Sequence, residues 1–299
     1  MVKYGMIVDR LNRYKRLNSV ALISMALMAF QLQACDRPTT VDTDLHHLPA
    51  YCDVNNNRLT LPSIPDDQLS RIHLQVNHES PKLDEKFVNG IIRSVLKVQF
   101  GVLQQTENGS ITTFLQRTGF TITPQGLVIA AQHGAEQNGV LLPGSELETG
   151  QQVGLVGSGG SEWLGTVTAT DLTRDLALIS AINYDGLYLP PADASQLKVE
   201  DLVVIPGYPA DRTGTKSSLF VGFGRYVGSA KGRVSTSDAP IFDDYTMAFA
   251  TPRQYGFGIS GAPVIGLDGR AYGYSVMTST DTSGEKPQHY LFAHPIECQ

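Results

Sequence analysis

Short runs of apolar and β-branched residues, separated by turn residues, recur along the chain from about residue 95. The clearest of them cover residues 98–103, 111–115, 219–226, 233–236 and 245–250. Two further runs flank Thr-Pro-Gln-Gly at 123–126, where proline in the second position and glycine in the fourth favour a type I turn. The pattern predicts strands joined by tight turns.

Two more features belong to this pattern. Apolar runs at 264–265 and 271–274 are joined through Asp268-Gly269, which is a strong short-range hairpin signal. Before the first strand, residues 83–93 favour a short helix, because Phe87, Ile91 and Ile92 would lie near one face. We therefore expect a β-rich chain preceded by one short packing helix.

The first 34 residues have a different character. Basic residues precede an apolar-rich stretch of about eleven residues, which suits an export signal and is shorter than the roughly 20 residues that a membrane span needs. The stretch ends in Leu-Gln-Ala-Cys at 32–35, which resembles a bacterial lipobox, although Gln33 is bulkier than the small residue usual there. This resemblance implies an exported protein that is lipid-anchored through Cys35 to the bacterial cell envelope and faces the periplasm. A plain secretory signal and an uncleaved anchor remain the alternatives.

Residues 35–82 are expected to form a flexible tether. The segment from Asp36 to about Pro65 is polar and is interrupted by four prolines. Cys52 lies in this segment and Cys298 lies near the end of the chain, so a disulfide between them would connect the two regions. Two free thiols are the alternative, because the bond requires an oxidising compartment.

Composition narrows the function. The chain is 41% hydrophobic and 17% charged, which allows a substantial core. The net charge is −6, and it becomes −10 without the first 34 residues, which hold five of the 23 basic residues and one of the 29 acidic ones. An acidic chain without a basic cluster gives no support for nucleic-acid binding. No cluster has metal-ligand spacing, so neither a metal nor an organic cofactor is expected.

Candidate chemistry centres on Ser260. Gly258 and Gly261 let the backbone turn sharply enough to expose the hydroxyl and to direct peptide N–H groups toward one point, which suits acyl transfer. Gly-Ile-Ser-Gly-Ala-Pro-Val at 258–264 resembles the Gly-x-Ser-Gly-Gly-Pro-Val block of the trypsin/chymotrypsin-like serine proteases, and within them the HtrA/Deg-like and glutamyl-endopeptidase-like branch. Ile259 stands where Asp or Asn is usual, and Ala262 stands where Gly is usual.

Two upstream blocks resemble the same family. Leu-Val-Ile-Ala-Ala-Gln-His at 127–133 is similar to its Val-Ile-Thr-Ala-x-His block, which implies that His133 is the general base. Asp-Leu-Ala-Leu-Ile at 175–179 is similar to its Asp-Leu-Ala-Leu-Leu segment, which implies that Asp175 orients the imidazole. Asp171 is the less favoured acid and has the character of a turn residue. The order His133, Asp175, Ser260 is the order of this family.

The resemblance covers about residues 95–295 and implies two six-stranded antiparallel β-barrels. The protease domain would span 83–299, with the first barrel at about 95–190 and the second at about 195–299. The N–H groups of Gly258 and Ser260 would form the oxyanion hole. Gln254, Val276 and Thr278 would contact substrate. Because only a few residues follow position 295, no PDZ domain is expected.

We therefore expect a serine endopeptidase that acts on proteins or peptides and prefers an apolar or small residue before the cleaved bond. A second hypothesis is a weak or inactive protease-fold protein that binds peptides or partners, because Ile259, Ala262 and Gln132 depart from the family blocks. An α/β-hydrolase is disfavoured, because its acid and histidine follow the serine and only 39 residues remain after Ser260. The oligomeric state does not follow from the sequence.

Overall fold

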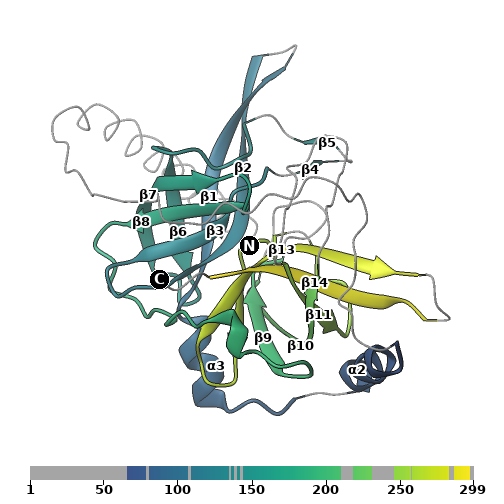
Figure 1. The fold of residues 1–299 in the computed structure, drawn as a ribbon. Helices are drawn as coiled ribbons and strands as arrows, with labels where there is room; N and C mark the ends of the chain where they lie inside the picture. The colour runs from purple at the N-terminus through teal and green to yellow at the C-terminus, as the bar shows by residue number, and fades with distance from the viewer. Residues whose placement is uncertain are drawn as a thin grey trace, which may run out of the picture. The chain divides into compact units, whose positions relative to one another are not determined.

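The computed structural model, drawn in Figure 1, covers most of the chain after residue 65. It describes residues 66–78, 81–106, 109–134, 136–137, 140–141, 144–209, 218–230, 246–256, 258–282 and 286–296. The export signal, Cys35, Cys52, Cys298 and the strand expected at 233–236 lie outside the described residues. Within the described part of the chain, no helix is both long and apolar enough to cross a membrane.

Six strands close the first barrel in the order β1-β2-β3-β8-β7-β6, and every neighbouring pair is antiparallel. They are β1 (Val95–Thr106), β2 (Gly109–Thr121), β3 (Leu127–Ala131), β6 (Gln152–Gly157), β7 (Glu162–Asp171) and β8 (Leu176–Ala181). Buried residues alternate along β6, β7 and β8, as expected when one face of each strand fills a barrel. A small pair, β4 (Glu136–Gln137) and β5 (Val140–Leu141), follows β3 in the chain.

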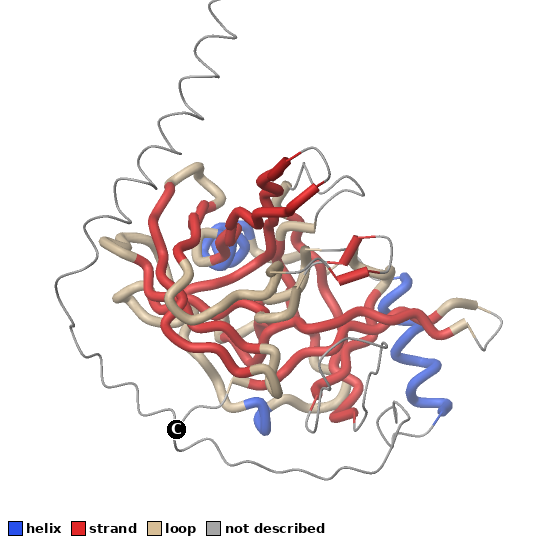
Figure 2. Tube along the Cα trace, turned by 90° about the horizontal axis from the view of Figure 1, so that it is seen from above, coloured by secondary structure: helices blue, strands red, loops and turns tan. Residues whose placement is uncertain are grey.

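The second barrel repeats the connectivity of the first. Its order is β10-β11-β14-β13-β12-β9, closed by pairing of β9 with β10 and β12. The strands are β9 (Leu202–Gly207), β10 (Phe220–Ala230), β11 (Thr246–Thr251), β12 (Pro263–Gly266), β13 (Ala271–Asp281) and β14 (Gln288–Pro295). Figure 2 shows how strands dominate the described chain. The expected all-β double barrel is thus confirmed.

Apolar packing continues from one barrel to the other. One cluster contains Phe120 and Ile129 of the first barrel together with Val204 and Ile265 of the second. Leu189, in the connection between the barrels, belongs to the same cluster. Its backbone N donates to Thr121 O at 2.8 Å, which fixes the connection to the first barrel. The two barrels therefore share a core, which fixes the ends of β3 and β12 relative to each other.

The helices include one that the sequence indicated and one that it did not. α3 (Glu85–Ile92) falls within the expected range 83–93, and its N-cap Asp84 accepts hydrogen bonds from Lys86 N and Phe87 N. α2 (Asp66–His78) lies where we expected only a tether. Ile72 and Val76, one helical turn apart, are fully buried against the second barrel, and this packing stabilises the helix.

Candidate active site

β3 brings His133 to the rim of the first barrel. All residues from Val128 to Ala131 are buried, so the strand is held on both faces, and the chain leaves it through Gln132 and His133. The imidazole is half-buried, and its Nδ1 lies 2.5 Å from Asp175 Oδ2. The structure therefore joins two residues that the sequence placed 42 positions apart.

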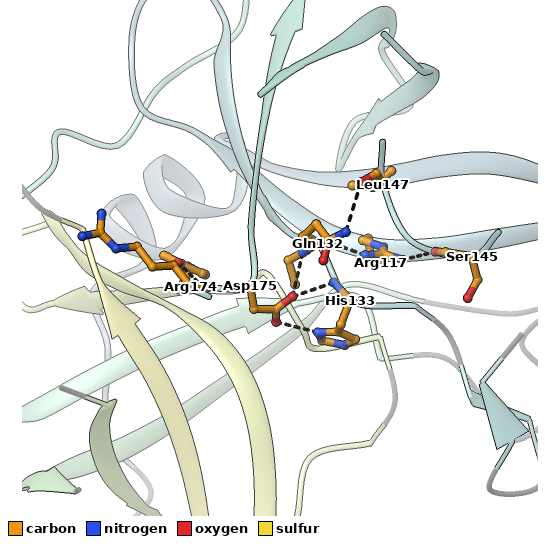
Figure 3. Close-up of polar contacts among 9 residues, drawn as sticks. Arg117, Gln132, His133, Ser145, Leu147, Arg174 and Asp175 are labelled. Carbon is orange, nitrogen blue, oxygen red and sulfur yellow. Dashed lines mark hydrogen bonds and ion pairs between the residues drawn. The ribbon is translucent and has the colours of Figure 1, made fainter. Parts of the chain in front are cut away.

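Asp175 is fully buried directly before β8 and has φ 51°, a left-handed backbone conformation that few non-glycine residues adopt. Its Oδ1 accepts hydrogen bonds from Gln132 N at 2.9 Å and from His133 N at 2.5 Å, as Figure 3 shows. Together with the contact to Nδ1, these bonds satisfy both carboxylate oxygens. An ionised Asp175 requires a proton on Nδ1, which leaves Nε2 as the basic nitrogen of the ring.

Asp171 has the turn role that the sequence suggested. Its Oδ1 accepts from Thr173 N, Thr173 Oγ1 and Arg174 N, and its Oδ2 lies 3.8 Å from Arg174 Nε. Asp171 thus closes the turn between β7 and β8. Asp175 is the acid that contacts His133.

Ser260 lies in a tight turn before β12, bracketed by Gly258 at φ 87° and Gly261 at φ 83°. Ala262 N donates to Ile259 O at 2.8 Å, and Gly261 N donates to Ser275 O at 2.7 Å. These two bonds fix the turn to itself and to β13. Both glycines have backbone angles that other residues rarely adopt, which explains their place in the motif.

This turn packs on the first barrel next to the strand that brings His133. Thr118 N donates to Ser260 O at 3.2 Å, and Thr118 Oγ1 donates to Gly258 O at 2.7 Å. A Cβ at Gly261 would collide with Thr118 O and would lie 2.8 Å from Ala131 N. The serine turn therefore lies against the end of β3, two residues before His133.

The expected oxyanion donors are the N–H groups of Gly258 and Ser260. Neither donates to a described residue, whereas the neighbouring N–H groups of Gly261 and Ala262 are both bonded within the turn. The carbonyl of Gly258 is fixed to Thr118, so the peptide that follows Gly258 has a defined orientation.

The departures from the family motif have packing explanations. Ile259 and Ala262 are buried and belong to the core cluster of the second barrel. Gln132 is buried, and its Nε2 donates to Leu147 O at 3.3 Å. Ile259 and Ala262 thus pack in a core, whereas Gln132 makes one side-chain hydrogen bond and its buried Oε1 has no described partner.

The expected substrate-contacting residues come from two segments that meet. Thr278 Oγ1 donates to Tyr255 O at 3.1 Å, which joins β13 to the segment before the serine turn. Gln254 is exposed, Thr278 is half-buried and Val276 is buried. The two segments are therefore in contact, Val276 is buried, and the role of these residues in substrate binding stays a prediction.

Three further polar residues lie around this site, and sequence reasoning missed one of them, Arg117. Arg117 is buried beneath the end of β3, and burial lowers its pKa to about 10. His294 on β14 is buried, and burial lowers its pKa to about 4 although the charge of Asp175 opposes the shift. Tyr274 donates through its hydroxyl to Arg174 O at 2.6 Å, across the two barrels. Arg117 belongs to no recognisable block, so only the three-dimensional fold identifies it.

No group of three His, Cys, Asp or Glu side chains that could hold a metal occurs in the part of the chain that the structure describes. The side chains that this region offers for chemistry are the hydroxyl of Ser260, the imidazole of His133 and the buried carboxylate of Asp175.

Comparison with known proteins agrees with this geometry. Residues 117–273, just over half of the chain, match the family described as "Trypsin-like peptidase domain". A protein named "Probable periplasmic serine endoprotease DegP-like", from Chlamydia pneumoniae, is 26% identical over 185 residues. The aligned part is 62% of this chain and 33% of that relative, so the match spans about a third of the relative's length. The double barrel, the sequence blocks and the matched segment lead to one conclusion: the chain belongs to the trypsin-like peptidase domain family.

Proposed function

We propose that the protein is a serine endopeptidase with the triad His133, Asp175 and Ser260. The observation that carries this proposal is the contact of 2.5 Å between His133 Nδ1 and a fully buried Asp175 carboxylate, at the strand end on which the Ser260 turn packs. In the proposed site, Asp175 fixes the tautomer of the base, His133, and the nucleophile is Ser260 in its glycine-flanked turn.

The proposed reaction follows from these positions. Nε2 of His133 takes the proton of the Ser260 hydroxyl as its oxygen attacks a peptide carbonyl, and later returns a proton to the leaving amine. Asp175 holds the ring and stabilises the imidazolium. The N–H groups of Gly258 and Ser260 stabilise the negatively charged oxygen, and removal of one such donor typically slows a reaction roughly 10²- to 10³-fold.

A peptide substrate has a place to bind along β13. β12 pairs with β13 only from Ala271 to Tyr274, while β14 continues to pair with it as far as Asp281. In the described part of the chain, the later half of β13 therefore has one strand neighbour, and an extended peptide can add on the other side. We propose an apolar or small side chain before the cleaved bond, with Gln254, Val276 and Thr278 near it.

Location is part of the same proposal. The export signal with its lipobox-like end supports lipidation at Cys35 and a periplasm-facing position, and the printed name of the chlamydial relative also refers to the periplasm. An oxidising periplasm would allow the Cys52–Cys298 disulfide.

The hypothesis of a binding protein without turnover rested on Ile259, Ala262 and Gln132. Because each of these side chains has a packing or hydrogen-bonding role, none of them argues against a working site. No separate observation favours this second function.

The test is labelling of the purified protein with a fluorophosphonate probe, which reacts with an activated serine. We expect labelling of the wild type and none with Ser260→Ala or His133→Ala. His289→Ala is the matched control, because His289 lies on β14 and contacts Thr280 instead of the site. A well-folded wild type that is not labelled would contradict the proposed activity.

A further inference from the structure

Arg117 on β2 is a buried cation without a carboxylate in contact. Only 5% of its surface is exposed, and its guanidinium carbon lies 4.9 Å from the centre of the Phe100 ring. Among the described residues, no carboxylate oxygen lies within 4.0 Å of it. A charge buried in this way is costly unless its hydrogen bonds are satisfied. The partners that satisfy them are therefore informative.

Both partners are carbonyl groups that support His133 and Asp175. Nη1 donates to Ala131 O at 2.5 Å, and Ala131 is the last residue of β3. Nη2 donates to Ser145 O at 2.9 Å. One guanidinium thus holds the end of the histidine strand and the segment beside it. Figure 3 shows the bond to Ser145.

The segment that begins at Ser145 in turn holds Gln132. Leu147 N donates to Gln132 O at 3.1 Å, and Gln132 Nε2 donates to Leu147 O. Gln132 N is one of the three donors to the Asp175 carboxylate. The chain of contacts from Arg117 therefore reaches both His133 and Asp175 through backbone groups.

Charge provides a second connection. Burial lowers the pKa of Arg117, and the negative charges of Asp175 and Glu146 oppose that shift. The interaction is mutual, so the guanidinium also stabilises the buried charge of Asp175. The other charged and titratable groups near His133 and Asp175 are Arg117, Glu146, Asp171, Arg174 and His294. Arg117 is the one among them that bonds to the strand end before His133.

We propose that Arg117 is a positioning residue of the catalytic pair: its two-pronged guanidinium fixes the chain at Ala131 and Ser145, and its charge stabilises the Asp175 carboxylate. This inference rests on the proposed protease function. Arg117 would contribute in two ways, through the geometry of its two hydrogen bonds and through its positive charge. Different substitutions remove these two contributions.

Two substitutions test it. Arg117→Lys keeps the charge but cannot donate to both carbonyls in the same planar geometry. Arg117→Met keeps much of the apolar contact with Phe100 and removes both contributions. Arg225→Met is the matched control, because Arg225 also donates to a backbone carbonyl, that of Glu200, but lies on β10 of the second barrel.

The readouts are the rate of fluorophosphonate labelling as a function of pH and the low-field proton resonance of the His133 Nδ1–H. For Arg117→Met we expect labelling to slow by roughly tenfold or more, because the histidine strand end loses its anchor. Without the cation, a positive charge on the ring costs less, so the acid limb of the rate should move to higher pH. For Arg117→Lys we expect slower labelling with the acid limb of the wild type. Arg225→Met should leave the limb and the resonance unchanged.

A folded Arg117→Met protein with the rate, acid limb and resonance of the wild type would overturn the proposal. If that variant does not fold, Arg117→Lys decides, and a wild-type rate and resonance would then overturn it. Failure of both variants to fold would assign Arg117 a structural role alone and would also contradict it. An unlabelled wild type would contradict the proposed function instead, and the His133 resonance would still decide the role of Arg117.

Discussion

At the scale of single residues, Asp175 combines a strained backbone with a carboxylate that is hydrogen-bonded on both oxygens. Asp175 has a left-handed φ and no exposed surface, yet it accepts three hydrogen bonds from two consecutive residues. A conformation of this kind costs about 1 to 3 kcal/mol and persists only where the surroundings enforce it. Here the enforcement comes from the backbone N–H groups of Gln132 and His133.

Asp175→Asn tests this arrangement. Asparagine adopts left-handed backbone conformations, so the fold should be retained. The amide cannot accept bonds on both of its terminal atoms, which favours the wrong tautomer of His133. We expect labelling to fall by roughly 10³- to 10⁴-fold at an almost unchanged melting temperature. Asp171→Asn is the control, and equal losses in the two variants would contradict the assignment of Asp175.

Gly261→Ala tests the contact between the serine turn and the first barrel. The new methyl group would collide with Thr118 O and approach Ala131 N, both of which are backbone atoms that cannot move aside cheaply. We expect a loss of at least ~2 kcal/mol in the free energy of unfolding and no labelling.

Gly150→Ala is the control for that experiment. Gly150 has a comparable φ of 90° and nothing within 4 Å of an added Cβ, so only backbone strain of ~1 kcal/mol should appear. Equal losses of stability at positions 150 and 261 would show that strain alone, and not the contact, explains the glycine at 261.

At the scale of elements, α2 attaches to the second barrel through a small set of contacts. Arg71 and Gln68 both reach the Glu200 carboxylate at the turn before β9. His73 is buried edge-on against Tyr290, with ring centres 4.8 Å apart, and neither ring nitrogen contacts a described polar group. Burial lowers the pKa of His73 to about 4, His289 acts in the same direction, and Asp281 opposes it.

This burial predicts a dependence of stability on pH. His73 takes up a proton near pH 6.5 when unfolded and near pH 4 when folded, so the unfolded state binds more protons between these values. Stability should therefore fall as the pH decreases from 6.5 to 4, by up to about 1.4 kcal/mol per pH unit for this group. His294 contributes with the same sign. Urea unfolding of His73→Phe should show a shallower decline than the wild type, and an identical slope would show that His73 does not contribute.

The elements that could be predicted were those with a local signal. The strand before His133 was clear, because a proline-glycine turn and a continuous apolar run define β3. α2 was missed because its attachment depends on Ile72 and Val76, whose buried partners lie far away in the sequence. Arg117 was missed for a related reason: an arginine in a strand normally faces solvent, and only the folded chain surrounds it with carbonyl groups.

At the scale of the whole molecule, the proposed site is divided between the barrels. His133 and Asp175 come from the first barrel and Ser260 from the second, so labelling requires both barrels and their contact. Leu291→Ala removes a fully buried side chain from the core of the second barrel, and we expect a loss of ~2 to 5 kcal/mol in the free energy of unfolding. The urea midpoint of labelling should shift together with that of tryptophan fluorescence from Trp163, which lies in the first barrel.

Leu267→Ala is the control, since Leu267 is 57% exposed and its loss should change stability by no more than about 0.5 kcal/mol. If labelling in Leu291→Ala shifted while the Trp163 signal did not, the two barrels would unfold independently, in contradiction to the shared core.

The path of the chain between α2 and the barrels has one further consequence. α2 packs on the second barrel, although the strands of the first barrel are the next to follow it in the sequence. In the sequence, α2 precedes the first barrel and the second barrel follows it. The first barrel is therefore connected to the second barrel by the chain that follows it and also through α2. A protease cut in the exposed connection near Leu187 and Tyr188 would produce one fragment with α2 and the first barrel and another with the second barrel. The two fragments should stay associated, because α2 packs on the second barrel. Such a nicked protein should elute from a sizing column as one species and separate only in denaturant.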